Sequence, residues 1–485
     1  MMRKAVVQGL GARLSAAQAV AAPSRGIFSF FGKSNGTSLS EPLPGFVAPE
    51  PAVPTKPPTT QVTTLPNGAK IASENTPGAT ATIGVYVDSG SVYEDEATAG
   101  SSHLLEYLAF RGTAHRSHLR LVREVEAIGG AVVAAASREQ AAFAVDAPSA
   151  AAAAAAEVAV DAALFPSLAP YEVHAAAERL AADSKKLDEA PQTLLLEGAH
   201  AVAYEGGLAR PLVASPEAAA ALDPEAVAAF HAATFTAPRV VVAGAGVEHQ
   251  ALVDAVAPLL ETLPAAAGPE APASPYVGGD WRRATNAPET HVVLAFPFAG
   301  GWRDLDGSVA ATVAQYLLGG GGSFSAGGPG KGMHSLLHLN VLNNYGWVSH
   351  ASALASIHND AGIVGIYAAG DSARAGDLVS VAADQLARLA SPVAAAELER
   401  AKAAAVSSVL MNLESRAVVA EDIGRQVLTY GQRKDVDAFV SAIKALTPEA
   451  LAARFADALK KPPTLAALGN AAAVPRYDVI SKHFN

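Results

Sequence analysis

One short segment has the residue types and spacing of a metal-dependent hydrolase. His103, Glu106 and Tyr107 stand in the order H-x-x-E-Y, which is close to H-x-x-E-H. In the complete motif two histidines one helical turn apart bind zinc, and the glutamate activates the metal-bound water. Here tyrosine takes the last position, and a phenol with a pKa of about 10 is a poor zinc ligand beside imidazole. We therefore expect no working zinc centre and interpret His103 and Tyr107 as residues that now serve helix packing and hydrogen bonding.

Two other groups of histidines have spacings that could bind a metal. His334 and His338 lie four residues apart, but no carboxylate stands between them and no third ligand follows nearby. We interpret this pair as structural. His115, Arg116 and His118 form a short basic cluster, which we expect to be a solvated loop. Neither group has the ligand set of a zinc site.

A glycine-rich stretch is the second feature that could carry chemistry. Residues 319–332 read GGGGSFSAGGPGKG, with eight glycines among fourteen residues. Gly330-Lys331 suggests a phosphate-binding loop, but Ser325 stands where the first glycine of G-x-x-x-x-G-K-[ST] belongs, and Gly332 stands where serine or threonine must hold magnesium. A nucleotide site is therefore excluded. Because glycine loses more entropy on ordering than any other residue, we expect either a mobile loop or one that contacts a ligand through bare backbone.

Length and composition limit the class of protein. With 485 residues the chain should hold two or more domains, since single cores rarely exceed about 250 to 300 residues. It contains no cysteine, so disulfides, thiolate nucleophiles and thiolate metal sites are excluded. A net charge of −11 argues against a nucleic-acid partner and is compatible with basic peptides. No uninterrupted apolar stretch reaches about 18 residues, so we expect a soluble protein or one peripheral to a membrane.

The N-terminal region differs from the rest of the chain. No acidic residue occurs before Glu41. This composition is typical of a mitochondrial transit peptide, which we assign to residues 1–40, with a disordered basic tail as the alternative. Residues 41–59 are rich in proline and predict an extended tether without a core. The basic residues of the first segment are Arg3, Lys4, Arg13, Arg25 and Lys33.

An internal repeat predicts the domain organisation. The segment ALDPEAVAA begins at residue 221 and recurs as ALTPEALAA at an offset of 224. Each copy reads as a helix start, with Asp223 or Thr447 at the N-cap and proline at the first helical position. A short apolar strand follows each copy at the same offset. We therefore predict an α+β fold with two homologous halves.

The halves are expected at residues 60–262 and 286–485, joined by a hinge linker at 263–285. Within the first half, Asn67-Gly68 between two apolar runs predicts a β-hairpin. A helix is expected to carry the H-x-x-E-Y segment. The first half thus holds the degenerate motif, and the second holds the glycine-rich stretch.

Taken together, these features resemble the pitrilysin-type peptidases, a family of inverted zincins, and within it the mitochondrial processing peptidases and the related core subunits of the cytochrome bc1 complex. The likeness extends from about residue 42 to the C-terminus and includes the two-half repeat. It implies a processing-peptidase-like fold. The segments that carry it are the glycine-rich stretch with Lys331-Gly332-Met333, Val341-Leu342-Asn343, EAIGG from Glu126, ASREQ from Ala136, PQ-x-LLLE from Pro191, and LARPL from Leu208.

The resemblance also implies where the rest of a zinc site would be. The third zinc ligand of the family, a glutamate, corresponds to Asp183, whose side chain is one methylene shorter. Two of the four positions His103, Glu106, Tyr107 and Asp183 therefore depart from the pattern. Loss of a ligand should lower metal affinity severely, since even outer-shell changes cost roughly 10- to 100-fold. An independent peptidase in which Tyr107 replaces the missing ligand remains an alternative.

By the same resemblance, the chain is expected to be a non-catalytic, substrate-recognising alpha-type subunit. It would handle basic presequence peptides for cleavage by a beta-type partner (core subunit 1 homologue) that bears the zinc. It would lie on the matrix side of the mitochondrial inner membrane and also serve as core subunit 2 among the other subunits of the cytochrome bc1 complex. The alternative is a purely structural core subunit.

The glycine-rich stretch is expected to contact the peptide, because backbone donors and acceptors can meet extended substrates of many sequences. An insertion without a role is the alternative. Lys331 is its one charged side chain. The expected substrate-binding residues are Gly319, Gly320, Gly321, Gly322, Ser323, Phe324, Ser325, Ala326, Gly327, Gly328, Pro329, Gly330, Lys331 and Gly332.

Overall fold

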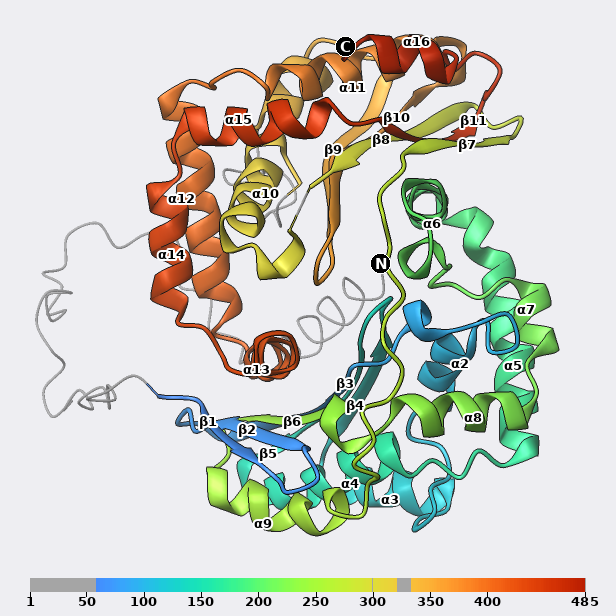
Figure 1. Ribbon diagram of the computed structural model, residues 1–485, viewed down its shortest axis with the longest axis vertical. Coiled ribbons are helices and arrows are strands. Elements are labelled where there is room, and N and C mark those ends of the chain that lie inside the picture. Colours follow the sequence, from blue (N-terminus) through green and yellow to red (C-terminus); the bar gives the residue numbers. More distant parts are fainter. Residues whose placement is uncertain (1–57, 299, 321–332, 485) are drawn as a thin grey trace, which may run out of the picture. The chain divides into compact units, whose positions relative to one another are not determined.

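The computed structural model describes residues 58–298, 300–320 and 333–484. These residues belong to one compact unit. The expected transit peptide, most of the expected tether, and residues 321–332 of the glycine-rich stretch lie outside the described residues. The described chain folds into α-helices and two separate β-sheets (Figure 1).

The first half of the described chain contains a six-stranded mixed sheet. Its strand order is β1-β2-β6-β3-β5-β4. Only β2 and β6 run parallel, and the other neighbours are antiparallel. The strands are β1 (Gln61–Thr64), β2 (Lys70–Glu74), β3 (Thr80–Val87), β4 (Ala131–Ala136), β5 (Ala141–Pro148) and β6 (Val240–Ala245).

The second half contains a five-stranded sheet in the order β7-β11-β8-β10-β9. Here β7 and β11 run parallel, and the other neighbours are antiparallel. The strands are β7 (Gly279–Ala284), β8 (Glu289–Pro297), β9 (Val348–Ile357), β10 (Gly362–Asp371) and β11 (Thr464–Gly469).

The two sheets repeat one topology. The series β2-β6-β3-β5-β4 matches β7-β11-β8-β10-β9 in order and in the direction of every pairing. The predicted α+β fold with two homologous halves is therefore confirmed. Strand β7 lies inside residues 263–285, which we expect to be linker. Its exposed Asp280 and Arg283 give it the composition of a loop, although it pairs with β11 along its length.

Short-range sequence signals account for several element boundaries. The Asp223 carboxylate accepts hydrogen bonds from the backbone N–H of Glu225 and Ala226 at 2.6 and 2.9 Å, and the Thr447 hydroxyl accepts from Ala450 at 3.2 Å. Both predicted N-caps are confirmed. In the predicted hairpin between β1 and β2, Gly68 has φ +97°, a left-handed conformation that glycine adopts without strain.

Helices cover both sheets. Those of the first half are α2 (Ser101–Leu108), α3 (His118–Ala127), α4 (Ala152–Leu164), α5 (Pro170–Ser184), α6 (Pro191–Ala203), α7 (Pro216–Ala221), α8 (Pro224–Thr234) and α9 (His249–Leu260). Those of the second half are α10 (Leu305–Leu318), α11 (Ala375–Arg388), α12 (Ala395–Asn412), α13 (Arg416–Tyr430), α14 (Val436–Ala445), α15 (Pro448–Leu459) and α16 (Tyr477–Lys482). Shorter helical turns include η3 (Lys185–Glu189), η4 (Gly207–Ala209) and the π-helical η7 (His338–Leu342).

Two helices are exchanged between the halves. Helix α6 of the first half packs on β7, β8 and β11 of the second sheet, where Leu195, Ala199 and Ala203 are fully buried. Helix α13 of the second half packs on β2, β3 and β6 of the first sheet, where Val419, Ile423 and Val427 are buried. The two sets of residues are related by the offset of 224, so the exchange follows the internal repeat. Figure 1 shows both helices beside the sheet of the other half.

Candidate functional site

The degenerate motif lies on α2, whose start is fixed by a buried carboxylate. The backbone N–H groups of Gly100 and Ser102 each donate a hydrogen bond of 2.8 Å to the carboxylate of Glu94. Burial raises the pKa of Glu94 to about 7, and these two hydrogen bonds oppose the shift. Glu94 therefore caps the helix from outside it. This cap holds the following turn, with His103, in place.

The imidazole of His103 is already engaged by the backbone. Its Nδ1 accepts a hydrogen bond of 3.2 Å from the N–H of Ala214, so the proton of the neutral ring is on Nε2. Burial lowers the pKa of His103 to about 4, which keeps the ring neutral. The ring of Tyr107 lies edge-on to it, with centroids 5.4 Å apart. His103 thus connects α2 to the segment before α7.

The other three positions are engaged as well. The Glu106 carboxylate accepts a hydrogen bond of 2.9 Å from the N–H of Ala136 at the end of β4, and burial raises its pKa. The Tyr107 hydroxyl donates to Asp183 Oδ2 at 3.2 Å. Burial, followed by the nearby Asp183 charge, raises the pKa of Tyr107 to about 12. Lys186 donates to Asp183 Oδ1 at 2.7 Å and holds the pKa of that carboxyl low.

These donor atoms do not fit a zinc ion. Zinc needs deprotonated ligands directed at one point, yet the Tyr107 phenol keeps its proton and donates it in a hydrogen bond to Asp183. The Lys186 ammonium, with the Arg179 guanidinium 3.9 Å from Asp183, already supplies positive charge there. Across the described residues, no three His, Cys, Asp or Glu side chains are grouped to hold a metal ion. The structure brings the four positions together as a hydrogen-bonded contact between α2, α5 and β4.

The structure describes only some of the other residues that the sequence singles out, which are the second histidine pair and the glycine-rich stretch. His334 is exposed, and His338 begins the π-helical turn. Of the glycine-rich stretch, Gly319 ends α10 in a left-handed conformation with φ +118°. A Cβ on Gly320 would lie 2.6 Å from the carbonyl oxygen of Ala353. Gly321, Gly322, Ser323, Phe324, Ser325, Ala326, Gly327, Gly328, Pro329, Gly330, Lys331 and Gly332 lie outside the described residues.

The basic cluster at His115 is only in part the solvated loop that we expect: the His115 side chain is 53% exposed, but that of Arg116 is 14% exposed and His118 begins α3. Asp161 on α4 is completely buried and accepts hydrogen bonds from Thr113 at 2.7 Å, His115 at 2.6 Å and Arg116 at 2.8 Å. Arg116 also pairs with Glu124 of α3 at 2.6 Å. A buried carboxylate requires such partners. The visible signal was Asp161 itself, a lone charge within the apolar helix sequence VAVDAAL.

Sequence reasoning also missed a buried histidine pair at the contact between the halves. His200 on α6 donates from Nδ1 to the carbonyl of Leu196 at 2.8 Å. Its Nε2 lies 3.1 Å from Ser356 Oγ and 3.2 Å from His358 Nε2. Burial lowers the pKa of both imidazoles, to about 3 for His358. The signal for this contact was a histidine within GAHAVA, the apolar end of α6.

The described residues contain one large open cavity of about 640 Å³. It lies between the first half and strand β7. Most of its lining is apolar, and a bidentate ion pair between Arg283 and Asp188, with both N–O distances 2.7 Å, closes one side. Apolar and small residues from α6, η4 and the following loop form the wall: Leu194, Gly198, Ala201, Ala209, Pro211, Val213 and Ala214.

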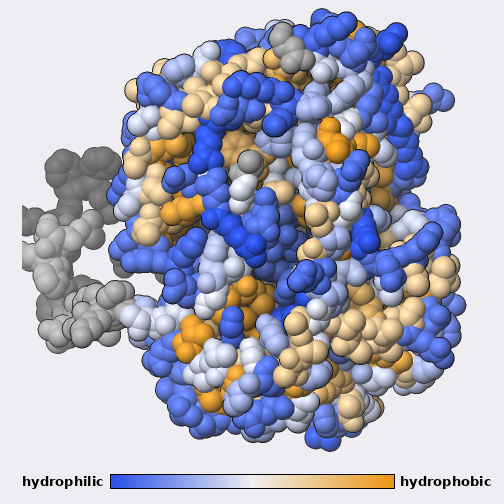
Figure 2. All heavy atoms as spheres, in the orientation of Figure 1, coloured by the Kyte–Doolittle hydropathy of each residue, from blue (hydrophilic) through white to orange (hydrophobic). Residues whose placement is uncertain are grey.

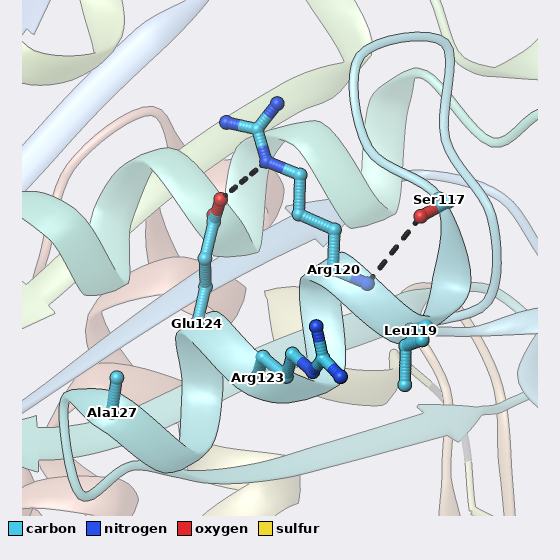
Figure 3. A pocket seen from close by; sticks show the side chains of 6 residues that line it. All are labelled: Ser117, Leu119, Arg120, Arg123, Glu124 and Ala127. Atoms are coloured by element: carbon cyan, nitrogen blue, oxygen red, sulfur yellow. Dashed lines mark hydrogen bonds and ion pairs between the residues drawn. The ribbon is translucent and has the colours of Figure 1, made fainter.

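A smaller depression of about 280 Å³ follows α3 (Figure 3). The Ser117 hydroxyl caps the helix by accepting from the N–H of Arg120 at 3.4 Å, and Arg120 pairs with Glu124 at 2.7 Å. All lining residues belong to this one helix and its cap, so the depression is a feature of the helix surface.

The surface of the described chain is relevant to membrane crossing and to peptide binding. Hydrophilic residues cover most of the face drawn in Figure 2, and apolar residues form separate patches. Among the described residues, no helix is long and apolar enough to cross a membrane. Strand β4 is an edge of the first sheet, and its Val132 and Val133 side chains are 40% and 53% exposed. An exposed apolar edge of this kind can pair with an extended peptide.

Comparison with protein-family models gives two matches. Residues 70–216 match the model "Insulinase (Peptidase family M16)", and residues 221–405 match "Peptidase M16 inactive domain". Among solved structures, a chain of complex III2 from Candida albicans is similar, with a TM-score of 0.74 and 21% identity. The match covers 87% of this chain and 99% of that one. At this identity the likeness shows the fold.

Curated relatives are similar over nearly the whole chain. A probable mitochondrial-processing peptidase subunit alpha-1 from Arabidopsis thaliana is 46% identical over 450 residues, covering 92% of this chain and 89% of the relative. The mitochondrial-processing peptidase subunit alpha of Solanum tuberosum is 43% identical, covering 97% and 95%. The human mitochondrial-processing peptidase subunit alpha is 34% identical, covering 93% and 90%.

Proposed function

This chain belongs to peptidase family M16, and we propose that it is the non-catalytic, substrate-recognising alpha subunit of a mitochondrial processing peptidase. The names of its relatives support this role. The observation that carries the non-catalytic part is the Tyr107–Asp183 hydrogen bond. It joins the two positions that depart from the zinc-binding pattern and leaves neither free to bind metal.

The proposed substrate is the basic presequence of an imported precursor. Two features support peptide handling. The exposed edge of β4 offers backbone groups to an extended chain, and Glu106 fixes the end of that strand at Ala136. The glycine-rich stretch, residues 319–332, offers backbone with few side chains in the way. The net charge of −11 attracts basic peptides over long range.

The proposal includes a partner and a location. A beta-type subunit, the core subunit 1 homologue, carries the zinc and cuts the peptide. The pair works on the matrix side of the mitochondrial inner membrane. A second role as core subunit 2 of the cytochrome bc1 complex is supported by the fold shared with a complex III chain. The competing proposal is a purely structural core subunit without a processing role.

One comparison tests the non-catalytic assignment. The full chain is purified alone and with its beta partner, and presequence cleavage and bound zinc are measured for each. We expect cleavage and zinc only in the pair. The variant Tyr107→Phe, which removes the hydroxyl and cannot bind metal, should leave cleavage by the pair within about twofold of wild type. Zinc-dependent cleavage by the isolated chain would overturn the assignment.

A second experiment separates substrate handling from a structural role. Deletion of residues 321–332 should raise the KM of the pair for presequences and leave assembly with the partner unchanged. Lys331→Ala tests the single charge of the stretch, and Lys461→Ala on an exposed turn of the described chain is the matched control. Unchanged presequence kinetics after the deletion would favour the purely structural role.

A further inference from the structure

We propose that the free edge of β7 and the cavity beside it form a second peptide site, which takes an extended segment carrying an apolar and a basic side chain. This inference rests on the proposed peptide-handling function. It assigns a binding surface to residues other than those of α2, β4 and the glycine-rich stretch. The site lies where the first half meets the second sheet.

The first argument is the hydrogen bonding of β7. The backbone N–H of Gly279 donates to Pro463, and that of Thr285 donates to Gly469, so the odd-numbered positions face β11. The N–H and C=O groups of the even-numbered positions, Asp280, Arg282 and Ala284, therefore point to the other edge. Strand β7 ends the sheet order, and no other described strand pairs with it. A peptide strand can use these groups.

The second argument is the cavity of about 640 Å³. Trp281 and Arg283, at alternate positions of β7, line it together with α6. Cavities of roughly 300–1,000 Å³ at domain contacts commonly bind ligands. A peptide paired with β7 would direct every second side chain to the same face as Trp281. Its apolar side chain would then enter the space beside Leu194 and Ala201.

The third argument concerns the polar groups of the lining. Ser184 Oγ is buried and has no hydrogen-bond partner within the described chain, so a donor or acceptor from a peptide would satisfy it. Asp188 and Arg283 neutralise each other. Two exposed charged residues of the lining, Glu217 and Lys185, form no ion pair among the described residues. Glu217 is the group that attracts a basic side chain, and Lys185 opposes it.

Binding is measured with the full chain, alone and paired with its beta partner. The probe is a fluorescein-labelled peptide of alternating leucine and arginine, and the readout is the anisotropy of the fluorescein. Ala201→Trp fills the cavity from an exposed helical position and should weaken binding about tenfold or more. Ala175→Trp, at an exposed alanine of α5 outside the cavity, is the matched control and should bind as wild type does.

Strand pairing and charge have their own variants. Ala284→Pro removes one backbone N–H that points to the free edge of β7, a loss that an edge strand tolerates. It should weaken binding of the peptide about tenfold without lowering the Tm. Glu217→Lys should weaken binding of the arginine-containing peptide, whereas Lys185→Glu should strengthen its binding. Unchanged binding in Ala201→Trp and Ala284→Pro, with binding by wild type intact, would overturn this site alone. A wild-type chain that binds no presequence-like peptide, alone or paired, would overturn the proposed function itself.

Discussion

The two exchanged helices, α6 and α13, contact the sheet of the other half through different side chains. Helices α6 and α13 are related by the offset of 224 and bury the same apolar positions against the sheet of the other half. At one such position α6 has His200 and α13 has Gly424. His200 reaches Ser356 and His358 by hydrogen bonds, whereas a Cβ on Gly424 would lie 2.1 Å from the ring of Tyr86.

Charge is distributed differently around the two helices. Beside α13, the Arg433 guanidinium donates to Glu74 of β2 and to Asp422, the latter at 2.9 Å. Arg433 and Glu74 are 9% and 10% exposed, so this is a buried ion pair. The polar groups beneath α6 include two imidazoles that burial keeps neutral. Helix α6 also carries a buried ion pair, between Glu197 and Arg138 of the first half at 2.9 Å. The contact of α13 with the other sheet should therefore depend on the Arg433–Glu74 ion pair, and that of α6 with the other sheet on imidazoles that stay neutral.

Removal of the buried guanidinium should give the largest effect. Arg433→Met keeps the length of the side chain and leaves the Glu74 carboxylate buried without its cation. We expect a loss of about 3–5 kcal/mol in the free energy of unfolding, the usual cost of breaking a buried pair. Urea denaturation measures it. Adding Glu74→Gln should recover part of the loss, because the orphaned charge is then removed.

The matched control is on the α6 side. Arg283→Met breaks the Arg283–Asp188 pair, in which both side chains are about half exposed, and should cost no more than about 1 kcal/mol. Equal losses in the two variants would mean that burial of the Arg433–Glu74 pair does not set its contribution to stability.

The neutral imidazoles beneath α6 predict a pH dependence of intermediate size. The folded pKa of His358 is lowered to about 3 by burial and then by Arg138, from 6.5. A group with a lowered folded pKa contributes full stability above its unfolded pKa and loses it as pH falls. Between pH 7 and pH 5 the loss should be about 2 kcal/mol. Glu139, whose pKa burial raises to about 7, titrates in the same window and stabilises the fold as pH falls.

The His358 contribution is therefore measured as a difference between two proteins. His358→Gln keeps an amide that can hydrogen bond to His200 but does not titrate. Chemical denaturation across pH 5 to 7 should show that wild type loses more stability than this variant, by the amount given above. His334→Gln, at an exposed position, should follow wild type. If wild type and His358→Gln lose stability in parallel, the imidazole beneath α6 is not the source of the pH dependence.

Local features of this fold were predictable from sequence, and long-range ones were not. The caps at Asp223 and Thr447 and the hairpin at Gly68 depend on neighbouring residues, so their signals survive in a short window. The repeat predicted two halves because its offset is constant. Nothing in the α6 sequence indicates which sheet it covers, since its apolar residues would suit either one. That placement depends on contacts more than 80 residues away, such as Gly198 with Trp281.

In the candidate site, too, the local features were predictable from sequence and the long-range contacts were not. The spacing of His103, Glu106 and Tyr107 is local and predicted both the helix and its missing ligand. The role of Asp183 could be predicted only from the family resemblance. Its contact with Tyr107 joins residues 76 positions apart, which no local pattern indicates. The sequence of β7 predicts a linker, since an edge strand does not need an apolar face on both sides. The cavity beside it depends on that strand and could not be inferred.

The smallest effect we predict comes from adding one methyl group to each exchanged helix. Gly424→Ala gains about 1 kcal/mol of helix propensity but forces the methyl against Tyr86. That ring is 2% exposed and also lies against Gly84, where a Cβ would be 2.5 Å from it. Overpacking in a filled core costs about 1–3 kcal/mol, so the net loss should be about 1 kcal/mol.

Gly198→Ala on α6 makes the equivalent change against Trp281, at 2.5 Å. Trp281 lines the cavity of about 640 Å³ and can move into it, so the gain in helix propensity should offset most of the strain. Thermal unfolding of both variants measures the difference, and Tyr86→Leu should rescue Gly424→Ala. A larger loss from Gly198→Ala would mean that Trp281 is held as firmly as Tyr86, and that the contact beneath α6 is packed as closely as the one beneath α13.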